Sequence, residues 1–347
     1  MASTAGPTSR IVEPPPTAAA VFLVLVVRPG AEDAVREVLA DVSGLTRAVG
    51  FRSPESSLSC LTGIGAEVWP RLFGAPPPAR LHPLEPIVGP VHTAVATPGD
   101  LIFHLRAARM DLCFELARQL AIRLDGLADV VDEVHGFRYF DERDLLGFVD
   151  GTENPTGDEA VAAAVVGDED PDYAGGSYLV VQKYLHDLKA WHELSVEEQE
   201  AAIGRTKLDD IEIPDDQKAP NSHVALNSIT DDEGNDLDVV RANMAFGEIG
   251  KGEYGTYYAA YARTPEVTER MLRNMFLGDP PGTYDRILDF STAVTGGLFF
   301  VPTQDFLDDA PAPGRAESSA APDTPPEPAP TSDDHSLGIG SLRKETP

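Results

Sequence analysis

TYYAAYARTPEVTERMLRNMFLGDPP, residues 256–281, contains the pattern that decides the fold. Its first part, Thr256 to Arg263, is rich in aromatic residues and predicts a strand. Thr264 follows as the expected N-cap of a helix, with Pro265 at the first helical position. That helix is expected to run to about Leu277 and to end at the glycine that follows. The stretch therefore predicts a strand that leads directly into a helix.

An earlier part of the chain has the same order. Leu101 to Ala107 predicts a strand, and Met110 to Leu124 places apolar side chains on one helical face. Further strands, at Val21 to Val27 and at Ser177 to Tyr184, open the two halves, and a helical stretch follows each of them. Strand, helix, strand, repeated in each half, is the order of a ferredoxin-like unit. The expected fold class is therefore α+β, with two ferredoxin-like domains of the dimeric α+β barrel type.

The composition predicts where the folded part ends. A length of 347 residues favours about two domains. Residues 308–347 hold eight of the 30 prolines and no aromatic residue, which leaves too little apolar surface to offset the entropy of folding. We expect a disordered N-terminus (1–18), an N-terminal domain (19–146), a C-terminal domain (147–307), a disordered Pro-rich acidic linker (308–335) and a terminal peptide (336–347).

Charge and hydropathy exclude several classes of partner. Lys and Arg total 27 against 57 Asp and Glu, which gives a formal net charge of −30. Binding to nucleic acid or to an anionic membrane depends on basic contacts, so neither partner is expected. The longest apolar run, Ala18 to Val27, has ten residues and is well short of the ~20 that span a bilayer. Cys60 and Cys113 are too few for a disulfide framework, so a reducing cytoplasm is expected.

Two polar residues lie in apolar surroundings. The expected strand from Leu237 to Phe246 places Arg241 and Asn243 on one face, although both of its faces are mostly apolar. A buried guanidinium needs a paired charge or an anionic ligand. Arg241 therefore belongs either to a structural salt bridge or to a polarising site. His104, on the polar face of an earlier strand, is expected at the surface.

A histidine and a loop are further candidates. His223 heads the short apolar run His-Val-Ala-Leu after a turn and is either a ligand or an ordinary core residue. Gly147-Phe-Val-Asp-Gly-Thr-Glu-Asn-Pro155 predicts a tight loop that would hold the Asp150 carboxylate in one position. The simpler interpretation of Asp150 is that it caps the turn.

Together, these residues resemble a known family. The segment from Gly147 to Pro155 closely matches the signature of the dye-decolorizing peroxidases. The match continues with His223, with Arg241 and Asn243, and with the segment from Tyr284 to Gly296. The resemblance covers essentially the whole part of the chain that is expected to fold. Within the family, the chain is similar to the compact bacterial subgroup called type B.

The resemblance implies a haem-dependent peroxidase that reduces hydrogen peroxide and oxidises bulky organic donors such as dyes and phenols. It also implies one haem b per subunit and a homo-oligomer. His223 is then the proximal ligand of the haem iron. Asp285 is the expected hydrogen-bond partner of His223, with Asp289 as the alternative, because a carboxylate partner makes the imidazole a stronger donor. Arg205 is expected to contact a haem propionate.

On the opposite, distal face of the haem, the resemblance places the catalytic residues Asp150, Arg241 and Asn243. Asp150 would carry a proton from one peroxide oxygen to the other. Arg241 would stabilise the charge on the departing oxygen, and Asn243 would orient peroxide or water. The relative importance of Asp150 and Arg241 stays open. The acidic surface predicts a preference for neutral or cationic donors.

The extreme C-terminus carries a second resemblance. Ser336-Leu-Gly-Ile-Gly-Ser-Leu342 is similar to the cargo-loading peptide by which peroxidases of this family enter encapsulin nanocompartments. Leu337, Ile339 and Leu342 are the apolar residues expected to bind a groove of the encapsulin shell protein. The expected location is therefore the cytoplasm, inside an encapsulin nanocompartment. The alternative interpretation is a frayed terminus.

Two other functions fit the same features. One is a related α+β haem protein that breaks down chlorite or removes iron from haem, as a deferrochelatase does. The other is a haem carrier or storage module. A rapid spectral change on the addition of peroxide would distinguish the expected peroxidase from both.

Overall fold

The computed structural model describes residues 17–314. The first half of the chain contains one complete strand-and-helix unit. Its main elements are β1 (Ala19–Val27), α2 (Glu32–Gly50), β2 (Ser59–Gly65), β5 (Leu101–Ala107), α4 (Met110–Arg123) and β6 (Ala128–Phe137). Short elements lie between β2 and β5, namely α3 (Trp69–Leu72), β3 (Ile87–Val88) and β4 (Thr93–Ala94). The strand expected at Leu101–Ala107 and the helix after it are confirmed to within one residue at each end. The strand expected from Val21 begins two residues earlier, at Ala19.

The second half repeats the order with more insertions. Its strands are β7 (Ser177–His186), β8 (Val240–Arg241), β9 (Met244–Glu248), β10 (Glu253–Ala262) and β11 (Ser291–Val301). Its helices are α5 (Gly157–Ala164), α6 (Leu188–Glu193), α7 (Val196–Ile203), α8 (His223–Asn227), α9 (Pro265–Leu277) and α10 (Gln304–Asp309). Thr264 is at the N-cap position of α9 and Gly278 is at its C-cap, as the sequence predicts, although the Thr264 side chain makes no capping hydrogen bond.

Both sheets have the strand order of a ferredoxin-like unit. The first half is ordered β2-β5-β1-β6 and the second β11-β7-β10-β9, with β8 paired to β10 as a further short strand. In each half the first and third strands are therefore central and antiparallel. The expected α+β class with two ferredoxin-like units is confirmed. The domain boundary at 146/147 stays a prediction, and α10 continues to Asp309, past the expected end of the second domain.

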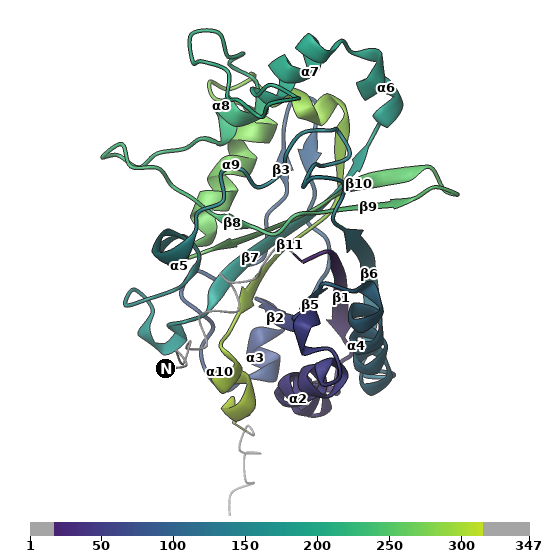
Figure 1. The fold of residues 1–347 in the computed structure, drawn as a ribbon. Coiled ribbons are helices and arrows are strands. Elements are labelled where there is room, and N and C mark those ends of the chain that lie inside the picture. The colour runs from purple at the N-terminus through teal and green to yellow at the C-terminus, as the bar shows by residue number, and fades with distance from the viewer. Residues whose placement is uncertain (1–16, 315–347) are drawn as a thin grey trace, which may run out of the picture. The chain divides into compact units, whose positions relative to one another are not determined.

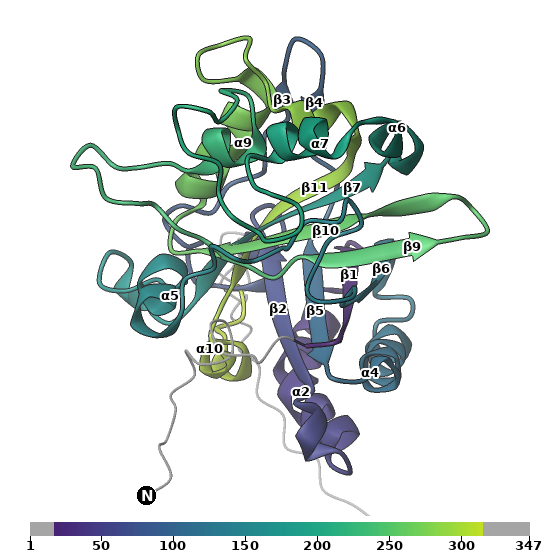
Figure 2. The ribbon, with the colours of Figure 1, turned by 45° about the horizontal axis from the view of Figure 1, so that its top comes forward.

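The two sheets join edge to edge into one closed barrel. β11 pairs with β2 at Phe299 and Gly65, and β6 pairs with β9 at Phe137 and Ala245. Figures 1 and 2 show α2 and α4 beside the strands of the first half, and α9 beside those of the second. Closure leaves neither sheet with a free outer edge at these joins, which removes a surface for unwanted strand pairing.

Apolar side chains from both halves fill the barrel. Along β1, Phe22 and Val24 face the interior, while Val21 and Leu23 belong to the cluster that packs against the helices. This alternation follows from the two-residue period of a strand. The interior cluster includes Ile102 from the first half, and it includes Leu179, Tyr257, Ala259 and Tyr261 from the second.

The structure overturns two sequence-based expectations. His104 is 1% exposed, so its placement at the surface is wrong. His104 pairs with Phe22 on the neighbouring strand and faces the barrel interior. Closure of the barrel therefore buries its side chain. The single strand expected from Leu237 to Phe246 is also wrong, because β8 and β9 are separated at residues 242 and 243. The Asn243 side chain accepts the Ala259 N–H at 3.1 Å, where a continuous strand would offer a backbone carbonyl.

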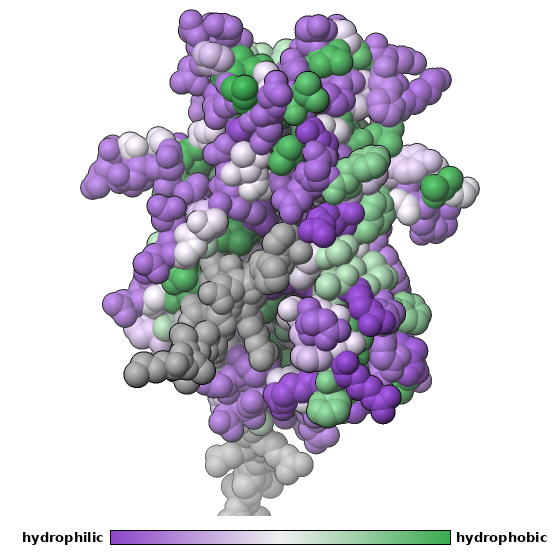
Figure 3. Space-filling model, in the orientation of Figure 1, coloured by the Kyte–Doolittle hydropathy of each residue, from purple (hydrophilic) through white to green (hydrophobic). Residues whose placement is uncertain are grey.

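The surface is mostly hydrophilic on the face shown in Figure 3, with separate apolar patches between the hydrophilic side chains. Among the described residues, no helix has the length and apolarity needed to cross a membrane. Cys60 and Cys113 are both buried free thiols. Three expected segments lie outside the described residues: the disordered N-terminus up to residue 16, the linker beyond residue 314, and the terminal peptide with Leu337, Ile339 and Leu342.

Candidate active site

A cavity lies between the strands of the second half and the loops and helices that cover them. Its open volume is about 1160 Å³, counted out to its mouth, and its walls are mostly apolar. A pocket of this size takes a ligand as large as a cofactor. The polar residues that line it include Asp144, Asp150, Glu153, Arg205, His223, Asn227, Arg241 and Asn243. The sequence-predicted residues Asp150, Arg205, His223, Arg241 and Asn243 therefore share one cavity.

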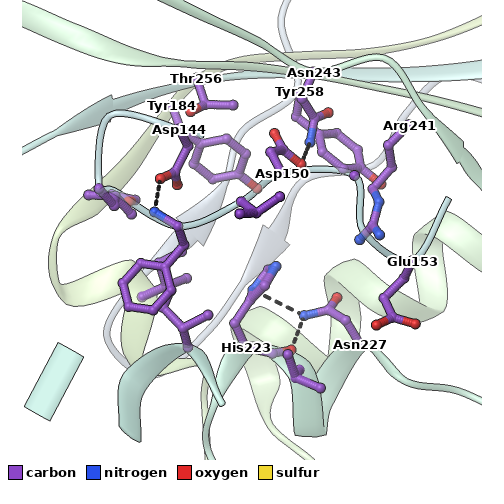
Figure 4. Close-up of a pocket in the computed structure, with 18 of the residues that line it drawn as sticks. Asp144, Asp150, Glu153, Tyr184, His223, Asn227, Arg241, Asn243, Thr256 and Tyr258 are labelled. Carbon is purple, nitrogen blue, oxygen red and sulfur yellow. Dashed lines mark hydrogen bonds between the residues drawn. The ribbon is translucent and has the colours of Figure 1, made fainter. Parts of the chain in front are cut away.

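His223 is the first residue of the short helix α8, and its ring faces the cavity (Figure 4). Ser222 caps this helix, because its hydroxyl accepts the Ala225 N–H at 3.3 Å. Gly204 lies directly behind the cap with φ +96°. A Cβ atom there would lie 3.0 Å from both Ser222 Oγ and Val224 Cβ. The glycine therefore permits the close packing that holds the start of α8 in place.

A buried carboxylate holds the His223 ring. Asp285 is fully buried, and its Oδ2 lies 2.8 Å from His223 Nδ1. The other oxygen, Oδ1, accepts the Ile287 N–H at 3.0 Å, so the carboxylate is itself fixed in place. Asn227 adds a hydrogen bond from its amide to the His223 carbonyl at 2.7 Å. Burial alone would lower the pKa of His223, but the charge and hydrogen bond of Asp285 raise it above its usual value. Nδ1 is thus engaged, and Nε2 is left for a ligand.

Asp289, the alternative partner, lies elsewhere. Its Oδ1 accepts the Tyr284 hydroxyl at 3.0 Å and lies 3.1 Å from His92 Nε2. Asp289 therefore belongs to a separate surface group, and Asp285 is the carboxylate in contact with His223.

Three polar side chains face His223 from the opposite wall of the cavity. Figure 4 shows Asp150, Arg241 and Asn243 on one side and His223 on the other. Asn243 donates from Nδ2 to Asp150 Oδ1 at 3.2 Å. Gly151 follows Asp150 with φ +89°, a backbone conformation that glycine adopts readily and other residues rarely do. The turn and the amide together hold one carboxylate oxygen in a defined position.

Arg241 is positioned through its backbone. Asn154 accepts the Arg241 N–H at 2.9 Å and donates to the Arg241 carbonyl at 2.8 Å, which ties the signature loop to β8. The Arg241 Nε is buried and has no hydrogen-bond partner among residues 17–314. This favours the polarising site over the structural salt bridge, because a partly buried guanidinium with a buried, unpartnered Nε is suited to an anionic ligand.

Arg205 lines the same cavity but already contacts carboxylates. Its Nε donates to Asp210 at 2.8 Å, and its Nη1 lies 2.6 Å from Glu153 and 3.6 Å from Glu212. The Glu153 side chain is 60% exposed, and an exposed pair of this kind contributes only about 0–1 kcal/mol. A ligand carboxylate could therefore replace Glu153 on Arg205 at small cost.

Sequence reasoning missed two residues of the cavity wall. Burial raises the pKa of Asp144 to about 7, although the carboxylate accepts the Phe148 N–H at 3.0 Å. Burial also lowers the pKa of His186 to about 4, and both of its ring nitrogens are hydrogen-bonded, to Ser291 and to Thr256. No local pattern marks either residue as part of the cavity wall.

The residues of the cavity fit a haem. One wall offers an imidazole whose Nε2 is available for an axial bond, and carboxylate support of such a ligand is typical. The apolar walls suit a macrocycle, and the partnerless Arg241 Nε suits an oxygen ligand on the other face. In the described part of the chain, no group of three or more His, Cys, Asp or Glu side chains is placed to hold a bare metal ion.

Comparison with known domain families gives two matches. The N-terminal domain of Dyp-type peroxidases matches residues 9–138, and the C-terminal domain matches residues 141–306. Fold and site together define a haem peroxidase built from paired ferredoxin-like halves. The chain belongs to the Dyp-type peroxidase family, and it is a haem peroxidase of the dye-decolorizing type with haem as its cofactor.

Curated relatives are similar along almost their whole length. The dye-decolorizing peroxidase of Mycolicibacterium paratuberculosis is 62% identical over 96% of this chain and 92% of the relative. That of Brevibacterium linens is 57% identical over 98% of this chain and 97% of the relative. These relatives do not favour the alternatives of haem storage, iron removal or chlorite breakdown.

Solved structures of dye-decolorizing peroxidases are also similar to this chain in fold and sequence. The encapsulated DyP-type peroxidase of Mycobacterium smegmatis has a TM-score of 0.85 and 64% identity, over 86% of this chain and 97% of that one. A DypB variant from Rhodococcus jostii RHA1 in complex with haem has a TM-score of 0.84 and 59% identity, over 85% of this chain and 96% of that one.

Proposed function

We propose that this peroxidase reduces hydrogen peroxide in the cavity between His223 and the group formed by Asp150, Arg241 and Asn243, and that it oxidises bulky organic donors. The observation that carries the proposal is the arrangement of these four side chains on opposite walls of one cavity. The imidazole and the three polar groups would contact opposite faces of a flat cofactor. Bound there, haem supplies the electrons that break the O–O bond.

His223 would hold the haem iron through Nε2. Its Nδ1 is hydrogen-bonded to Asp285 at 2.8 Å, and that carboxylate increases the electron-donating strength of the ring. Because Asp285 is fully buried and held by the Ile287 N–H, it keeps the ring in one orientation.

Asp150 would take the proton from the peroxide oxygen nearer to it and deliver that proton to the departing oxygen. The amide of Asn243 holds Asp150 Oδ1, which leaves Oδ2 for the proton. Arg241 would place its guanidinium beside the departing oxygen and stabilise the negative charge that develops there. The clamp from Asn154 keeps the backbone of Arg241 at the required distance from the loop.

Arg205 would bind a haem propionate at the wall of the cavity. Its ion pair with Asp210 orients the guanidinium, while the exposed Glu153 gives up its contact. The large donors would not enter the cavity and would be oxidised at a distance from it. The working form would be a homo-oligomer.

The C-terminal peptide would direct the enzyme into an encapsulin shell. Leu337, Ile339 and Leu342 lie beyond the described residues, and the proposal is supported by their apolar spacing in a polar tail and by the encapsulated relative from Mycobacterium smegmatis. Packaging would place the enzyme in a nanocompartment of the cytoplasm. Deleting residues 337–347 should leave peroxidase activity intact and abolish co-purification with the shell. Continued packaging of the truncated enzyme would refute this role.

An absorbance spectrum tests the proposed reaction. The haem-loaded enzyme should show a Soret band that changes rapidly when one equivalent of hydrogen peroxide is added, and that returns when a phenol donor follows. Haem binding without any change on adding peroxide would contradict the proposal and would favour a haem carrier.

A further inference from the structure

The barrel interior holds a buried tyrosine in contact with a buried histidine. The hydroxyl of Tyr261 lies 2.7 Å from His104 Nδ1, and the two side chains are 0% and 1% exposed. Their rings are nearly parallel, with an interplanar angle of 17°. Tyr261 comes from β10 of the second half and His104 from β5 of the first, so the contact bridges the two halves. The proposed peroxide reaction uses neither residue.

A second tyrosine on the same face of β10 has different surroundings. Tyr257, four residues before Tyr261, is also 0% exposed. Its hydroxyl has no hydrogen-bond partner among the described residues. Both tyrosines are therefore equally buried, but Tyr261 alone of the two has a base beside its hydroxyl. The chain thus supplies a natural control for the chemistry of the pair.

Burial keeps both members of the pair neutral. Burial raises the pKa of Tyr261 above its usual value, so the phenol keeps its proton. Burial, together with the charge of Arg106, lowers the pKa of His104 well below its usual value. A neutral imidazole carries one N–H, and in the tautomer with that proton on Nε2 the Nδ1 atom accepts from the phenol. The Nε2 atom has no partner in the described part of the chain.

This geometry suits oxidation of the phenol. Removing one electron from a phenol makes it a strong acid, so the electron leaves easily only where a base takes the proton at once. Nδ1 of His104 is at hydrogen-bond distance for that transfer. Tyr257 has no such acceptor among the described residues, and its oxidation would leave a buried positive charge.

The pair and the proposed peroxide site share strand β10 but lie on its opposite faces, with Tyr261 in the barrel interior and Tyr258 in the wall of the haem cavity. Tyr258 lines the haem cavity, and Tyr261 lies three residues further along the same strand. Tyr261 is in register with Val240, the neighbour of Arg241 in β8. A second cavity, of about 1600 Å³ counted out to its mouth, has His104, Arg241 and Asn243 in its wall. The imidazole therefore borders a space that also reaches the distal residues.

We propose that Tyr261 and His104 form a redox pair that holds one of the two oxidising equivalents delivered by peroxide. In the step, one electron passes from the Tyr261 phenol to the peroxide-oxidised haem, and the phenol proton moves to His104 Nδ1. The products are a neutral tyrosyl radical, an imidazolium and a haem reduced by one electron. An organic donor such as a phenol, bound in the second cavity, then returns one electron to Tyr261 and releases its own proton to solvent. The inference rests on the proposed peroxide reaction.

The surroundings of His104 favour the return of the proton to Tyr261. Burial and the neighbouring Arg106 charge oppose a lasting imidazolium. The proton therefore returns to the Tyr261 oxygen as soon as the donor electron arrives, and the pair is ready for a second turnover.

Electron paramagnetic resonance tests the proposal. Haem-loaded enzyme is mixed with one equivalent of hydrogen peroxide, frozen and scanned for a tyrosyl radical, with each signal normalised to bound haem. The wild type should give the radical, Tyr261→Phe should lose it, and the matched control Tyr257→Phe should keep it. His104→Gln keeps a hydrogen-bond acceptor but removes the base, so its signal should also be lost. This variant separates the chemistry from a structural role of the hydrogen bond.

The outcomes separate two kinds of failure. A signal in Tyr261→Phe equal to that of the wild type, an equal loss in Tyr257→Phe, or a full signal in His104→Gln would overturn the redox pair while the Soret band still responds to peroxide. A wild-type Soret band that does not respond would overturn the proposed peroxide reaction and the redox pair with it.

Discussion

The contact between His223 and Asp285 joins two side chains that are 62 residues apart in the chain. Asp285 also caps the 3₁₀ helix η3 (Arg286–Asp289), since its Oδ1 accepts the Ile287 N–H. One oxygen of the Asp285 carboxylate therefore caps η3, and the other is hydrogen-bonded to the His223 ring. This division explains why the residue is fully buried although it carries a charge, which would be costly without partners.

Asp285→Asn should weaken the electron donation of His223. An amide keeps the hydrogen-bond geometry but removes the negative charge, so the reduction potential of the bound haem should become more positive. The rate of the peroxide reaction should fall by about 10–100-fold, the usual effect of losing such a partner. Spectroelectrochemical titration measures the potential. Asp289→Asn is the matched control, because Asp289 contacts Tyr284 and His92 instead; an equal shift in both variants would contradict this assignment.

Asp144 should make the stability of the protein depend on pH. Its pKa is 3.8 in an ordinary environment and about 7 when buried here. Above about pH 4 the unfolded chain releases the proton while the folded protein retains it, so the free energy of unfolding falls as pH rises towards 7 and then levels off. The slope is at most about 1.4 kcal/mol per pH unit. In Asp144→Asn, the urea concentration at the unfolding midpoint should depend less on pH between pH 5 and 7 than it does in the wild type. An equal pH dependence of the midpoint in variant and wild type would refute this.

Local patterns identified part of the site and missed the rest for one reason. Asp150, Arg241 and His223 stand out because polar residues interrupt apolar or turn-forming stretches. Asp144 and His104 do not stand out, since each sits in a stretch with other polar residues. The burial of His104 comes from strands distant in sequence, and no short window of the chain contains that information.

The short helix α8 depends on close packing behind it. Gly204 is the C-cap of α7 with φ +96°, and an added Cβ there would lie 3.0 Å from the Oγ of Ser222, the N-cap of α8. Loops of this kind position a ligand only when their backbone is held from several sides. The strand interruption between β8 and β9 is similar, because the Asn243 side chain replaces a backbone group and turns Arg241 and Asn243 to the cavity.

Gly204→Ala should loosen α8 and lower haem affinity. The substitution adds the strain of a positive φ, about 1–2 kcal/mol, and pushes a Cβ to 3.0 Å from Ser222 and Val224. Gly126→Ala is the matched control, because Gly126 also has a positive φ but nothing within 4 Å of an added Cβ. Haem titration followed at the Soret band measures the effect. Equal loss of affinity in both variants would show that packing behind α8 is unimportant.

Closure of the barrel is a property that the sequence pattern did not predict in detail. The strand and helix order of each half is readable from periodicity, and the ferredoxin-like units follow from it. The pairs β2–β11 and β6–β9 join residues more than 100 positions apart, and no short-range signal specifies their register. This closure is also what buries His104 and creates the interior pair with Tyr261.

The net charge of the whole chain should select among donors. With a formal charge of −30, the surface attracts cationic donors and repels anionic dyes. Turnover of a cationic donor should therefore fall as salt is raised, and that of an anionic dye should rise, because salt screens both interactions. Steady-state kinetics with one dye of each charge between low and high salt measures this. An identical response of the two dyes to salt would contradict it.

The most direct test of the proposed site is the rate at which one equivalent of hydrogen peroxide changes the Soret band of the haem-loaded enzyme. Arg241→Leu should lower that rate by about 10²–10³-fold, since it removes the cation beside the departing oxygen. Arg118→Leu, which breaks an exposed pair with Glu115, should leave the rate unchanged. A wild-type rate in Arg241→Leu would contradict the assignment of this cavity as the place where peroxide is reduced.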